Sequence, residues 1–280
     1  MASPLVWQVR DRTLTITRPL VMGIVNVTPD SFSDGGRFLD PAAALDHALR
    51  LVDEGADLLD VGGESTRPGA APVPLDEELR RVIPVITGLA GRVAVPISAD
   101  TMKAEVARQA LAAGAAIIND VTALTGDPAM TEVVRAAGAG VILMHMQGTP
   151  QTMQLSPSYP YGVLAAVDYY FASRLQELPG LGISPERAAL DPGIGFGKTA
   201  EHNRDLLRDL KQLTRFGRPV CLGVSRKGFM GKLLNRPVGE RLAGSLAVAA
   251  HAVNQGAAQI LRVHDVAATR DVVTVLEWLK

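Results

Sequence analysis

Apolar, often β-branched runs alternate with segments of helical periodicity along the whole chain, and this alternation constrains the fold more than any other feature. The eight apolar runs are Val21–Val27, Leu58–Val61, Val95–Ala99, Ile117–Val121, Val141–Met144, Ala188–Leu190, Val220–Val224 and Gln259–Val263. The segments with helical spacing are Pro41–Glu54, Leu75–Leu89, Lys103–Ala113, Pro128–Ala137, Gly162–Leu178, His202–Leu213, Gly239–Gln255 and Ala267–Leu279. Strands that alternate with helices form a parallel sheet, and eight such units can close into a barrel.

The competing architecture is an open, doubly wound sheet. No G-x-G-x-x-G follows the first apolar run and no long polar linker divides the chain, so the closed barrel is favoured. Before that run, Val6–Val9 and Leu14–Thr17 flank a polar turn and predict a β-hairpin, which we expect under the barrel. The predicted fold class is α/β: a single (β/α)₈ TIM-barrel domain over residues 1–280, with the N-terminal hairpin in 1–20 and the barrel in 21–280.

Composition narrows the kinds of partner. The 280 residues include 28 basic and 29 acidic side chains and no basic run, which gives no electrostatic footprint for nucleic acid or an anionic membrane. The one cysteine, Cys221, allows no disulfide framework and fits a reducing compartment. No segment has the roughly 18 consecutive apolar residues that a membrane span needs, and the start lacks a signal-peptide pattern. We expect a cytoplasmic protein that acts on small molecules.

Polar residues follow nearly every apolar run, at the positions where barrel enzymes carry their catalytic groups. These residues are Asn26, Asp100, Asn119, Asp120, His145, Asp191, Ser225, Arg226, Lys227, Arg262, His264 and Asp265. Long, glycine-flanked loops follow the first two runs, at Thr28–Gly36 and Gly62–Gly69. The sequence therefore predicts an active site at the carboxyl ends of the strands.

A single acidic residue at a strand end is usually a helix cap, and this interpretation is kept for Asp120 and Asp265. Asp100, Asn119 and Asp191 are different because they lie within or directly at the end of an apolar run. An unpaired carboxylate there is costly unless a ligand or a cation compensates it. Their joint occurrence favours a binding site.

The predicted site has a cationic part and a part made of carboxylates and an amide. Arg67, Lys227, Arg262 and His264 supply cations, whereas the buried strand ends supply carboxylates and an amide. The physical complement is a substrate with an anionic end, such as a diphosphate, and a heterocycle with N–H donors and acceptors, whose guanidine-like edge would suit Asp191.

Two motifs are discounted, and one metal is favoured. Gly193–Thr199 imitates a P-loop, but Pro192 stands where the first glycine belongs. The histidines lack the H-x-H and H-E-x-x-H spacings of zinc hydrolases. With Asn26 as a neutral oxygen donor, Mg²⁺ held mainly by substrate phosphate is the better expectation.

At this point the chain resembles a known family. Gly23–Gly36 looks like the first signature of bacterial dihydropteroate synthases. Further blocks similar to that family are Asp60–Gly69, Met144–Gly148, Asp191–Lys198, Ser225–Lys227 and Arg262–Val266. The resemblance extends from about Val21 to the end of the chain.

The resemblance implies a transferase of folate synthesis that joins 6-hydroxymethyl-7,8-dihydropterin diphosphate to 4-aminobenzoate and releases diphosphate, with sulfonamides competing for the aminobenzoate site. Ionisation of the pterin–diphosphate bond would precede attack by the amine. The family's catalytic residues correspond to Asp100, Lys227, Arg67, Arg262 and His264. Its pterin site corresponds to Asp100, Asn119, Asp191, Lys227, Met144 and Phe196, and its diphosphate site to Asn26, Arg67, Arg262 and His264. The implied aminobenzoate pocket is Phe32, Thr66, Pro68, Phe196 and Ser225, Asn26 is the implied Mg²⁺ ligand, and a homodimer through the last helices, around Ala243–Ala252, is also implied.

The chain differs from the family's sequence pattern at two places, and two alternative functions are left open. Ala99 replaces the usual isoleucine before Asp100, and Thr122–Gly126 replaces a Ser-Gly-Gly type of segment. One rival is a corrinoid-dependent methyltetrahydrofolate methyltransferase, which would leave the cations without an anion. The other is a non-catalytic relative that binds a pterin or a sugar phosphate, which should have lost Asn26, Asp100 or Lys227. His145 belongs to a matching block, but the sequence gives it no chemical role.

Overall fold

Eight parallel strands form the centre of the molecule in a computed structural model that describes residues 5–28 and 41–280. The strands are β3 (Leu20–Asn26), β4 (Leu58–Gly62), β5 (Ile97–Asp100), β6 (Ile117–Asp120), β7 (Gly140–Met144), β8 (Ala188–Asp191), β9 (Cys221–Leu222) and β10 (Ile260–Val263). Their order in the sheet is β8-β7-β6-β5-β4-β3-β10-β9. A parallel bridge between Leu190 and Val220 brings the two ends of this order together, so the predicted barrel is confirmed.

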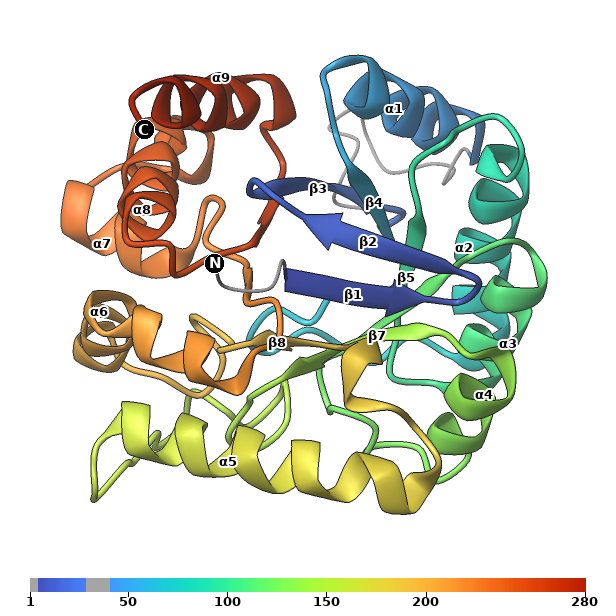
Figure 1. Ribbon diagram of the computed structural model, residues 1–280, viewed down its shortest axis with the longest axis horizontal. Coiled ribbons are helices and arrows are strands. Elements are labelled where there is room, and N and C mark those ends of the chain that lie inside the picture. Colours follow the sequence, from blue (N-terminus) through green and yellow to red (C-terminus); the bar gives the residue numbers. More distant parts are fainter. Residues whose placement is uncertain (1–4, 29–40) are drawn as a thin grey trace.

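Helices surround the strands (Figure 1). They are α1 (Pro41–Asp53), α2 (Leu75–Leu89), α3 (Ala104–Ala112), α4 (Met130–Ala137), α5 (Val163–Glu177), α6 (Ala200–Arg208), α7 (Gly228–Leu234), α8 (Leu242–Asn254) and α9 (Val266–Trp278). Short 3₁₀ helices lie at η2 (Leu178–Leu181), η3 (Pro185–Arg187), η4 (Leu210–Phe216) and η5 (Val238–Glu240). The sequence pattern predicted one helix where α6 and η4 follow each other, and it missed the short α7. Across residues 5–28 and 41–280, no helix has the length and apolarity that crossing a bilayer requires.

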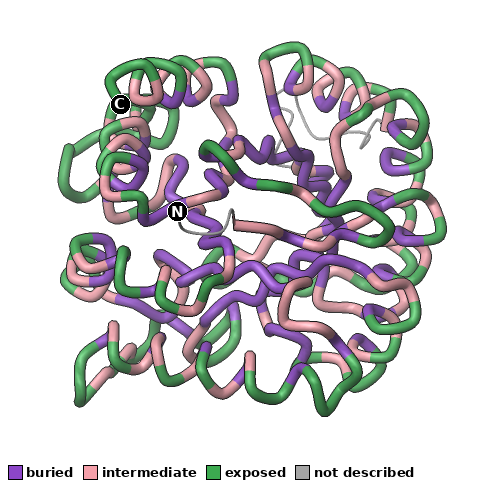
Figure 2. Tube along the Cα trace, viewed as in Figure 1, coloured by how far each residue is buried: buried purple, intermediate pink, exposed green. Residues whose placement is uncertain are grey.

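The main core lies between the strands and the surrounding helices, whose outer faces are exposed (Figure 2). Helix α2 illustrates the pattern: Val82, Val85, Ile86 and Leu89 recur at helical spacing and are almost fully buried. Each such side chain contributes about 1.5–3 kcal/mol through burial of its apolar surface. This packing holds the strands in register and therefore fixes where their carboxyl ends lie.

A hairpin closes the amino-terminal end of the barrel, as predicted. Strands β1 (Leu5–Val9) and β2 (Arg12–Ile16) pair in antiparallel fashion and cross the front of the barrel in Figure 1. Trp7 and Val9 are fully buried in a second apolar cluster, and the Trp7 Nε1 donates to the carbonyl of Arg187 at 2.8 Å. A Cβ at Gly140 would lie 2.6 Å from Val9, so glycine permits this close contact.

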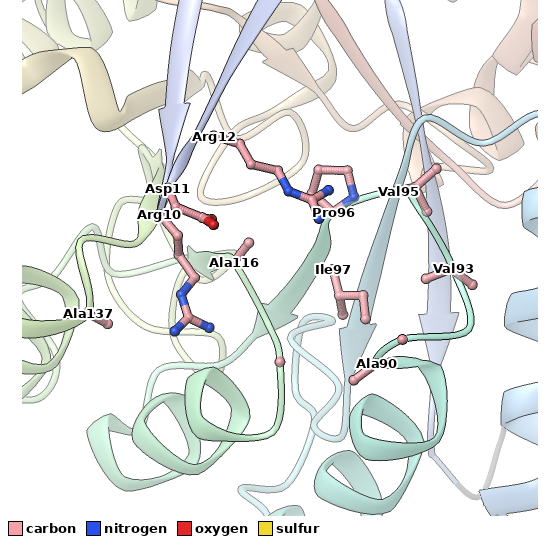
Figure 3. A pocket seen from close by; sticks show the side chains of 12 residues that line it. Arg10, Asp11, Arg12, Ala90, Val93, Val95, Pro96, Ile97, Ala116 and Ala137 are labelled. Carbon is pink, nitrogen blue, oxygen red and sulfur yellow. The ribbon is translucent and has the colours of Figure 1, made fainter.

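The hairpin turn also borders an open hollow of about 640 Å³ at the amino-terminal ends of β5 and β6 (Figure 3). Arg10 donates from Nη1 to the carbonyls of Leu111 and Ala115, and Arg12 donates to the carbonyl of Ala94. These arginines therefore bind the ends of neighbouring backbone segments. In barrels of this kind the amino-terminal face contributes to stability, and the chemistry takes place at the opposite face.

Candidate active site

Polar side chains lie together at the carboxyl ends of neighbouring strands because the strand register aligns them. Asn26 pairs with Gly62, Gly62 with Asp100, and Asp100 with Asn119 across β3, β4, β5 and β6. A Cβ at Gly62 would lie 3.2 Å from the Cβ of Asp100 and 3.4 Å from its Oδ2. Glycine at this position therefore leaves room for the Asp100 carboxylate.

A network of charged side chains inside the barrel joins strands β4, β5 and β10. Arg262 of β10 donates from Nε to the Oδ2 of Asp60 at 2.6 Å and from Nη2 to the Oδ2 of Asp100 at 2.7 Å. Burial alone would lower the pKa of Arg262, but the carboxylates of Asp60 and Asp100 raise it above its usual value. Arg262 therefore stays charged, and it is committed to two carboxylates in this structure.

Asp60 also orients the Asn119 amide. The Nδ2 of Asn119 donates to the Oδ2 of Asp60 at 3.0 Å, which assigns the amide nitrogen to the Asp60 side. Within residues 5–28 and 41–280, the Oδ1 of Asn119 has no hydrogen-bond partner. Asp60 is fully buried and was not among the predicted site residues, although it interrupts the apolar run Leu58–Val61. That interruption was the available signal.

The second half of the site is built on β7 and β8. Met144 pairs in register with Asp191, and the Oδ1 of Asp191 accepts a hydrogen bond from the Gly193 amide at 2.7 Å. In the loop after β8, the Phe196 ring lies under the Lys227 ammonium, whose Nζ is 4.3 Å from the ring centroid. This is a cation–π contact, and it places Lys227 over the loop that follows Asp191.

Burial moves the pKa values of the central charged groups toward neutral pH. Desolvation raises the pKa of Asp100 to about 7, although Arg262 opposes the shift. Desolvation also raises the pKa of Asp191, and it lowers the pKa of Lys227 to about 8. Perturbed groups clustered in one place are typical of functional sites.

His264 and Ser225 form a pair at the rim. The Ser225 Oγ accepts from the His264 backbone N–H at 3.2 Å and lies 3.0 Å from the His264 Nδ1. In the tautomer that carries the imidazole proton on Nε2, the Ser225 hydroxyl donates its own proton to Nδ1 while Oγ accepts the backbone N–H. Burial, followed by the charge of Arg262, lowers the pKa of His264 to about 4. His264 is therefore a neutral hydrogen-bond donor, not one of the cations of the rim.

Asp265 does not cap the helix that follows it, so that prediction was wrong. Its side chain makes no capping hydrogen bond to α9 and instead pairs with Arg226, whose Nε donates to Oδ2 at 3.0 Å. A bidentate guanidinium–carboxylate pair is stronger than a cap, and Arg226 reaches Asp265 from the end of the adjacent β9. This ion pair fastens the segment that carries Ser225 to the segment that carries His264.

Asp120 was predicted to cap a helix, but its carboxylate caps a turn instead, since the next helix, α4, begins only at Met130. Its Oδ1 accepts from the Thr122 amide at 2.8 Å and its Oδ2 from the Leu124 amide at 2.9 Å. These bonds hold Ala123 and Leu124 at φ values of 51° and 67°, in the left-handed region that favours glycine. The departure at Thr122–Gly126 is therefore accommodated by a turn that the Asp120 carboxylate holds in place.

Charged side chains hold the start of the loop after β4 in place. Lys103 donates to the carboxylates of Glu64 and the fully buried Glu78, and the Oγ1 of Thr101 donates to Glu78 at 2.6 Å. Arg67 lies further along this loop and is exposed. Its charge nevertheless reaches inward, since it helps to lower the pKa of both Lys227 and His264.

The structure thus brings most of the predicted residues to one end of the barrel. Asn26, Asp100 and Asn119 share one register level, and Met144, Asp191, Phe196 and Lys227 lie on the adjoining strands and loop. Thr66 and Pro68 lie on the loop with Arg67, where Thr66 is half-buried and Pro68 is exposed. Phe32 lies outside the described residues.

Comparison with known proteins is consistent with this geometry. Residues 22–264 match the family described as pterin binding enzyme. The dihydropteroate synthase of Escherichia coli strain K12 is 49% identical over 265 residues, which cover 95% of this chain and 93% of that protein. The chain belongs to the pterin-binding enzyme family, as a dihydropteroate synthase. It is therefore a transferase of folate synthesis.

Solved structures of this family have the same fold. The Yersinia pestis dihydropteroate synthase, in a complex with a sulfonamide drug, has a TM-score of 0.92, is 46% identical, and the match covers 98% of each chain. The Xanthomonas albilineans synthase with 4-aminobenzoic acid has a TM-score of 0.91 and is 47% identical, with 99% of this chain and 98% of that chain covered. The hairpin and the barrel of this synthase are thus features that its relatives share.

Proposed function

We propose that this synthase binds the pterin ring of 6-hydroxymethyl-7,8-dihydropterin diphosphate in the buried half of the site. The groups assigned to the ring are Asp100, Asn119, Asp191, Lys227, Met144 and Phe196. One observation carries the assignment: in the described part of the chain, Asp100, Asn119 and Asp191 each keep one side-chain oxygen without a protein partner. Three uncommitted acceptors at one end of a barrel suit a ring edge that is rich in N–H donors.

The diphosphate is assigned to the rim formed by Arg67, Arg262, His264 and Asn26. Arg67 supplies an exposed charge, and His264 supplies an Nε2–H donor. Arg262 uses its Nε–H and one Nη2–H on carboxylates, so the two Nη1 protons and the second Nη2 proton remain for an anion. This supports a division of labour in which Arg67 contacts the leaving group and Arg262 mainly serves the Asp60–Asp100 network.

Bond breaking is favoured by the same groups. Arg67 and His264 stabilise the departing diphosphate, and the dihydropterin carries the positive charge that develops at its exocyclic carbon. The Asp100 carboxylate stabilises that cation electrostatically, and the buried walls keep water from capturing it. The arylamine is neutral at pH 7, so its attack on the exocyclic carbon needs no general base. The C–N bond forms after the C–O bond to diphosphate has broken, and the resulting arylammonium loses its proton to the released diphosphate or to solvent.

The aminobenzoate is assigned to Phe32, Thr66, Pro68, Phe196 and Ser225. The Xanthomonas relative that binds 4-aminobenzoic acid supports this second substrate, and the Yersinia relative supports sulfonamides as its competitors. Ser225 lies beside His264 and just before α7, so the proposed pocket adjoins the rim. The amine would thereby approach the pterin carbon from the loop side.

The residues fit a metal that the substrate itself largely holds. The Asn26 side-chain amide makes no hydrogen bond within the described residues, and it lies at the same register level as Asp100. Among residues 5–28 and 41–280, no group of three or more His, Cys, Asp or Glu side chains gathers that could hold a metal alone. Asn26 would therefore hold Mg²⁺ through its neutral oxygen together with the diphosphate. When bound, Mg²⁺ neutralises charge on the leaving group.

We also propose a homodimer through the last helices. Large apolar side chains are exposed on α7, η5, α8 and α9, namely Leu233, Leu234, Val238, Leu242, Val275, Trp278 and Leu279. Apolar side chains gathered on a surface mark interaction sites. Within Ala243–Ala252, Ala249 and Ala252 pack inward, so only part of that segment is available to a partner. Light scattering should give twice the chain mass, and Leu242→Glu should give the monomer.

The assignments are tested by separating the two substrates. Asp191→Asn should weaken pterin binding by tenfold or more, because the ring edge loses an ionised acceptor. Ser225→Ala should instead raise the KM for aminobenzoate and leave pterin binding within about twofold. Steady-state kinetics and pterin titration measure both effects. If Asp191→Asn binds pterin like the parent protein, the pterin site is wrongly assigned.

A further inference from the structure

A buried lysine joins the two loops that follow β7 and β8. The Nζ of Lys198 donates to the Nδ1 of His145 at 3.0 Å, to the His145 carbonyl at 3.2 Å and to the Phe196 carbonyl at 3.0 Å. Only 2% of Lys198 is exposed. An ammonium has three donors, so these three acceptors satisfy it completely. The lysine side chain therefore fastens one loop to the other.

His145 acts here as a fixed acceptor. Its Nδ1 accepts a hydrogen bond from the Lys198 ammonium, so the ring's own proton is on Nε2. Burial and then the Lys198 charge lower the pKa of His145 to about 3, so the ring stays neutral. The Tyr170 ring packs edge-on at 5.0 Å and the Tyr159 ring lies at 6.0 Å, measured between centroids. These contacts fix the imidazole plane and leave it unsuited to shuttle protons.

The contact between the two loops is closer than side chains allow. Gly193 and Gly197 have φ values of +66° and +61°, and a Cβ on them would lie 1.9 Å from the His145 carbonyl oxygen and 2.7 Å from that of Gln147. Only glycine tolerates both the dihedral angles and the distances. The loop after β8 therefore packs directly against the backbone that follows β7, and the Lys198 amine binds both segments.

This loop carries groups that we assign to the pterin ring. The Gly193 amide donates to Asp191, and the Phe196 side chain lies under Lys227. We propose that Lys198, with His145 as its acceptor, is a positioning residue that holds Phe196 and Asp191 in place for the pterin ring. The inference rests on the proposed assignment of those two residues, and it gives a role to a segment that only imitates a P-loop.

A merely structural role explains the lysine poorly. Within residues 5–28 and 41–280, Lys198 makes no direct ion pair; burial lowers its pKa to about 7, although the charge of Asp191 opposes the shift. A buried cation without a direct ion pair costs stability, and an apolar side chain of the same length fills such a space at lower cost. The lysine is favoured where three acceptors on two loops have to be held at fixed positions.

The test replaces the ammonium and keeps the length of the side chain. Lys198→Met should weaken binding of 6-hydroxymethyl-7,8-dihydropterin diphosphate by tenfold or more, while the melting temperature stays within about 3 °C of the parent protein. Tyr159→Phe is the matched control because it removes only the 2.8 Å hydrogen bond from Tyr159 to the Gly197 carbonyl of the same loop. We expect this control to bind the pterin within about threefold of the parent.

A double-mutant cycle separates positioning from general damage. In a Phe196→Leu background, Lys198→Met should lose most of its effect on pterin affinity, because the positioned ring is already gone. Equal effects in both backgrounds would overturn the proposal, as would pterin affinity within twofold of the parent in Lys198→Met. If Lys198→Met unfolds, His145→Ala keeps the backbone acceptor and removes Nδ1, and it should weaken pterin binding at least threefold; an unchanged affinity would again overturn the proposal.

Failure of this inference and failure of the pterin assignment give different results. If Asp191→Asn removes pterin binding but Lys198→Met does not, the pterin site stands and Lys198 has no positioning role. If neither variant changes pterin affinity, the assignment itself is wrong. The parent chain, assayed for diphosphate release, serves as the reference for both.

Discussion

Arg262 and Asp100 form an ion pair, with 2.7 Å between Nη2 and Oδ2, that joins two strands separated by 162 positions in the sequence. The pair lies where we place the pterin ring, and it opposes the burial that raises the pKa of Asp100. Because the same guanidinium also binds Asp60, one side chain fixes both the charge and the position of the carboxylates.

Arg262→Met should therefore damage stability and activity together. Asp60 would be left fully buried without its cation, and removal of one partner from a buried pair costs about 3–5 kcal/mol. Asp100 would lose its counter-ion and become protonated at neutral pH. We expect the free energy of unfolding, measured with urea, to fall by about 3 kcal/mol and the rate to fall by on the order of 10². Arg262→Lys should recover only part of both, since an ammonium cannot reach two carboxylates in the same fork.

Asp100→Asn and Lys227→Ala should instead separate activity from stability. Each should lower the rate by on the order of 10² or more, because each removes a group assigned to the ring. Burial raises the pKa of Asp100, so its protonated carboxyl group favours folding below the unfolded pKa, and this contribution is lost as the pH rises through about 7. Little of it remains at neutral pH, and Arg262 keeps its pair with Asp60, so asparagine at this position should leave the melting temperature nearly unchanged.

Asp127→Ala is the opposite control for that pair of variants. The Oδ2 of Asp127 accepts from the Ala104 amide at the start of α3, at 2.8 Å, and neither residue is assigned to substrate. Loss of this interaction should cost about 1 kcal/mol of stability and leave the rate per folded molecule unchanged. If Asp100→Asn lowered the melting temperature more than Asp127→Ala does, Asp100 would have a structural role.

The pH dependence should be bell-shaped with a narrow maximum between about 7 and about 8. The proposed chemistry needs Asp100 ionised, which fails below its pKa of about 7, and Lys227 charged, which fails above its pKa of about 8. The two limbs belong to the coupled set of charges and not to single residues. Measurement of kcat/KM for the pterin substrate checks this, and Lys227→Arg should move the alkaline limb upward. A flat profile from pH 6 to 9 would contradict the assignment.

The positions of the strand ends could be read from the sequence because parallel strands end at one face. Asn26, Asp100 and Asn119 each close an apolar run, and the register confirms that they lie side by side. The partner of each group could not be read in the same way. Strands of a closed barrel are buried on both faces, so the pattern around Asp60 does not say that its side chain points inward.

The remaining differences between the sequence predictions and the structure come from interactions between residues that are far apart in the sequence. Asp265 has the sequence context of a cap, but Arg226 takes its carboxylate. Lys198 has the context of a P-loop lysine, but it turns back to His145, which is 53 positions away. Local propensity gives no information on such partners, because they are brought together only when the barrel closes.

Magnesium should matter for the diphosphate and not for the ring. With Asn26 as the proposed protein ligand, chelation by EDTA should weaken binding of pterin diphosphate by tenfold or more, because only the rim side chains then offset the full charge of the leaving group. Binding of a pterin that lacks the diphosphate should not change, since Asp100, Asn119 and Asp191 contact only the ring. Asn26→Ala should raise the magnesium concentration needed for half-maximal activity several-fold and leave the affinity for the diphosphate-free pterin intact. Equal loss of both ligands on chelation would show that magnesium supports the fold, and the assignment of Asn26 would then be wrong.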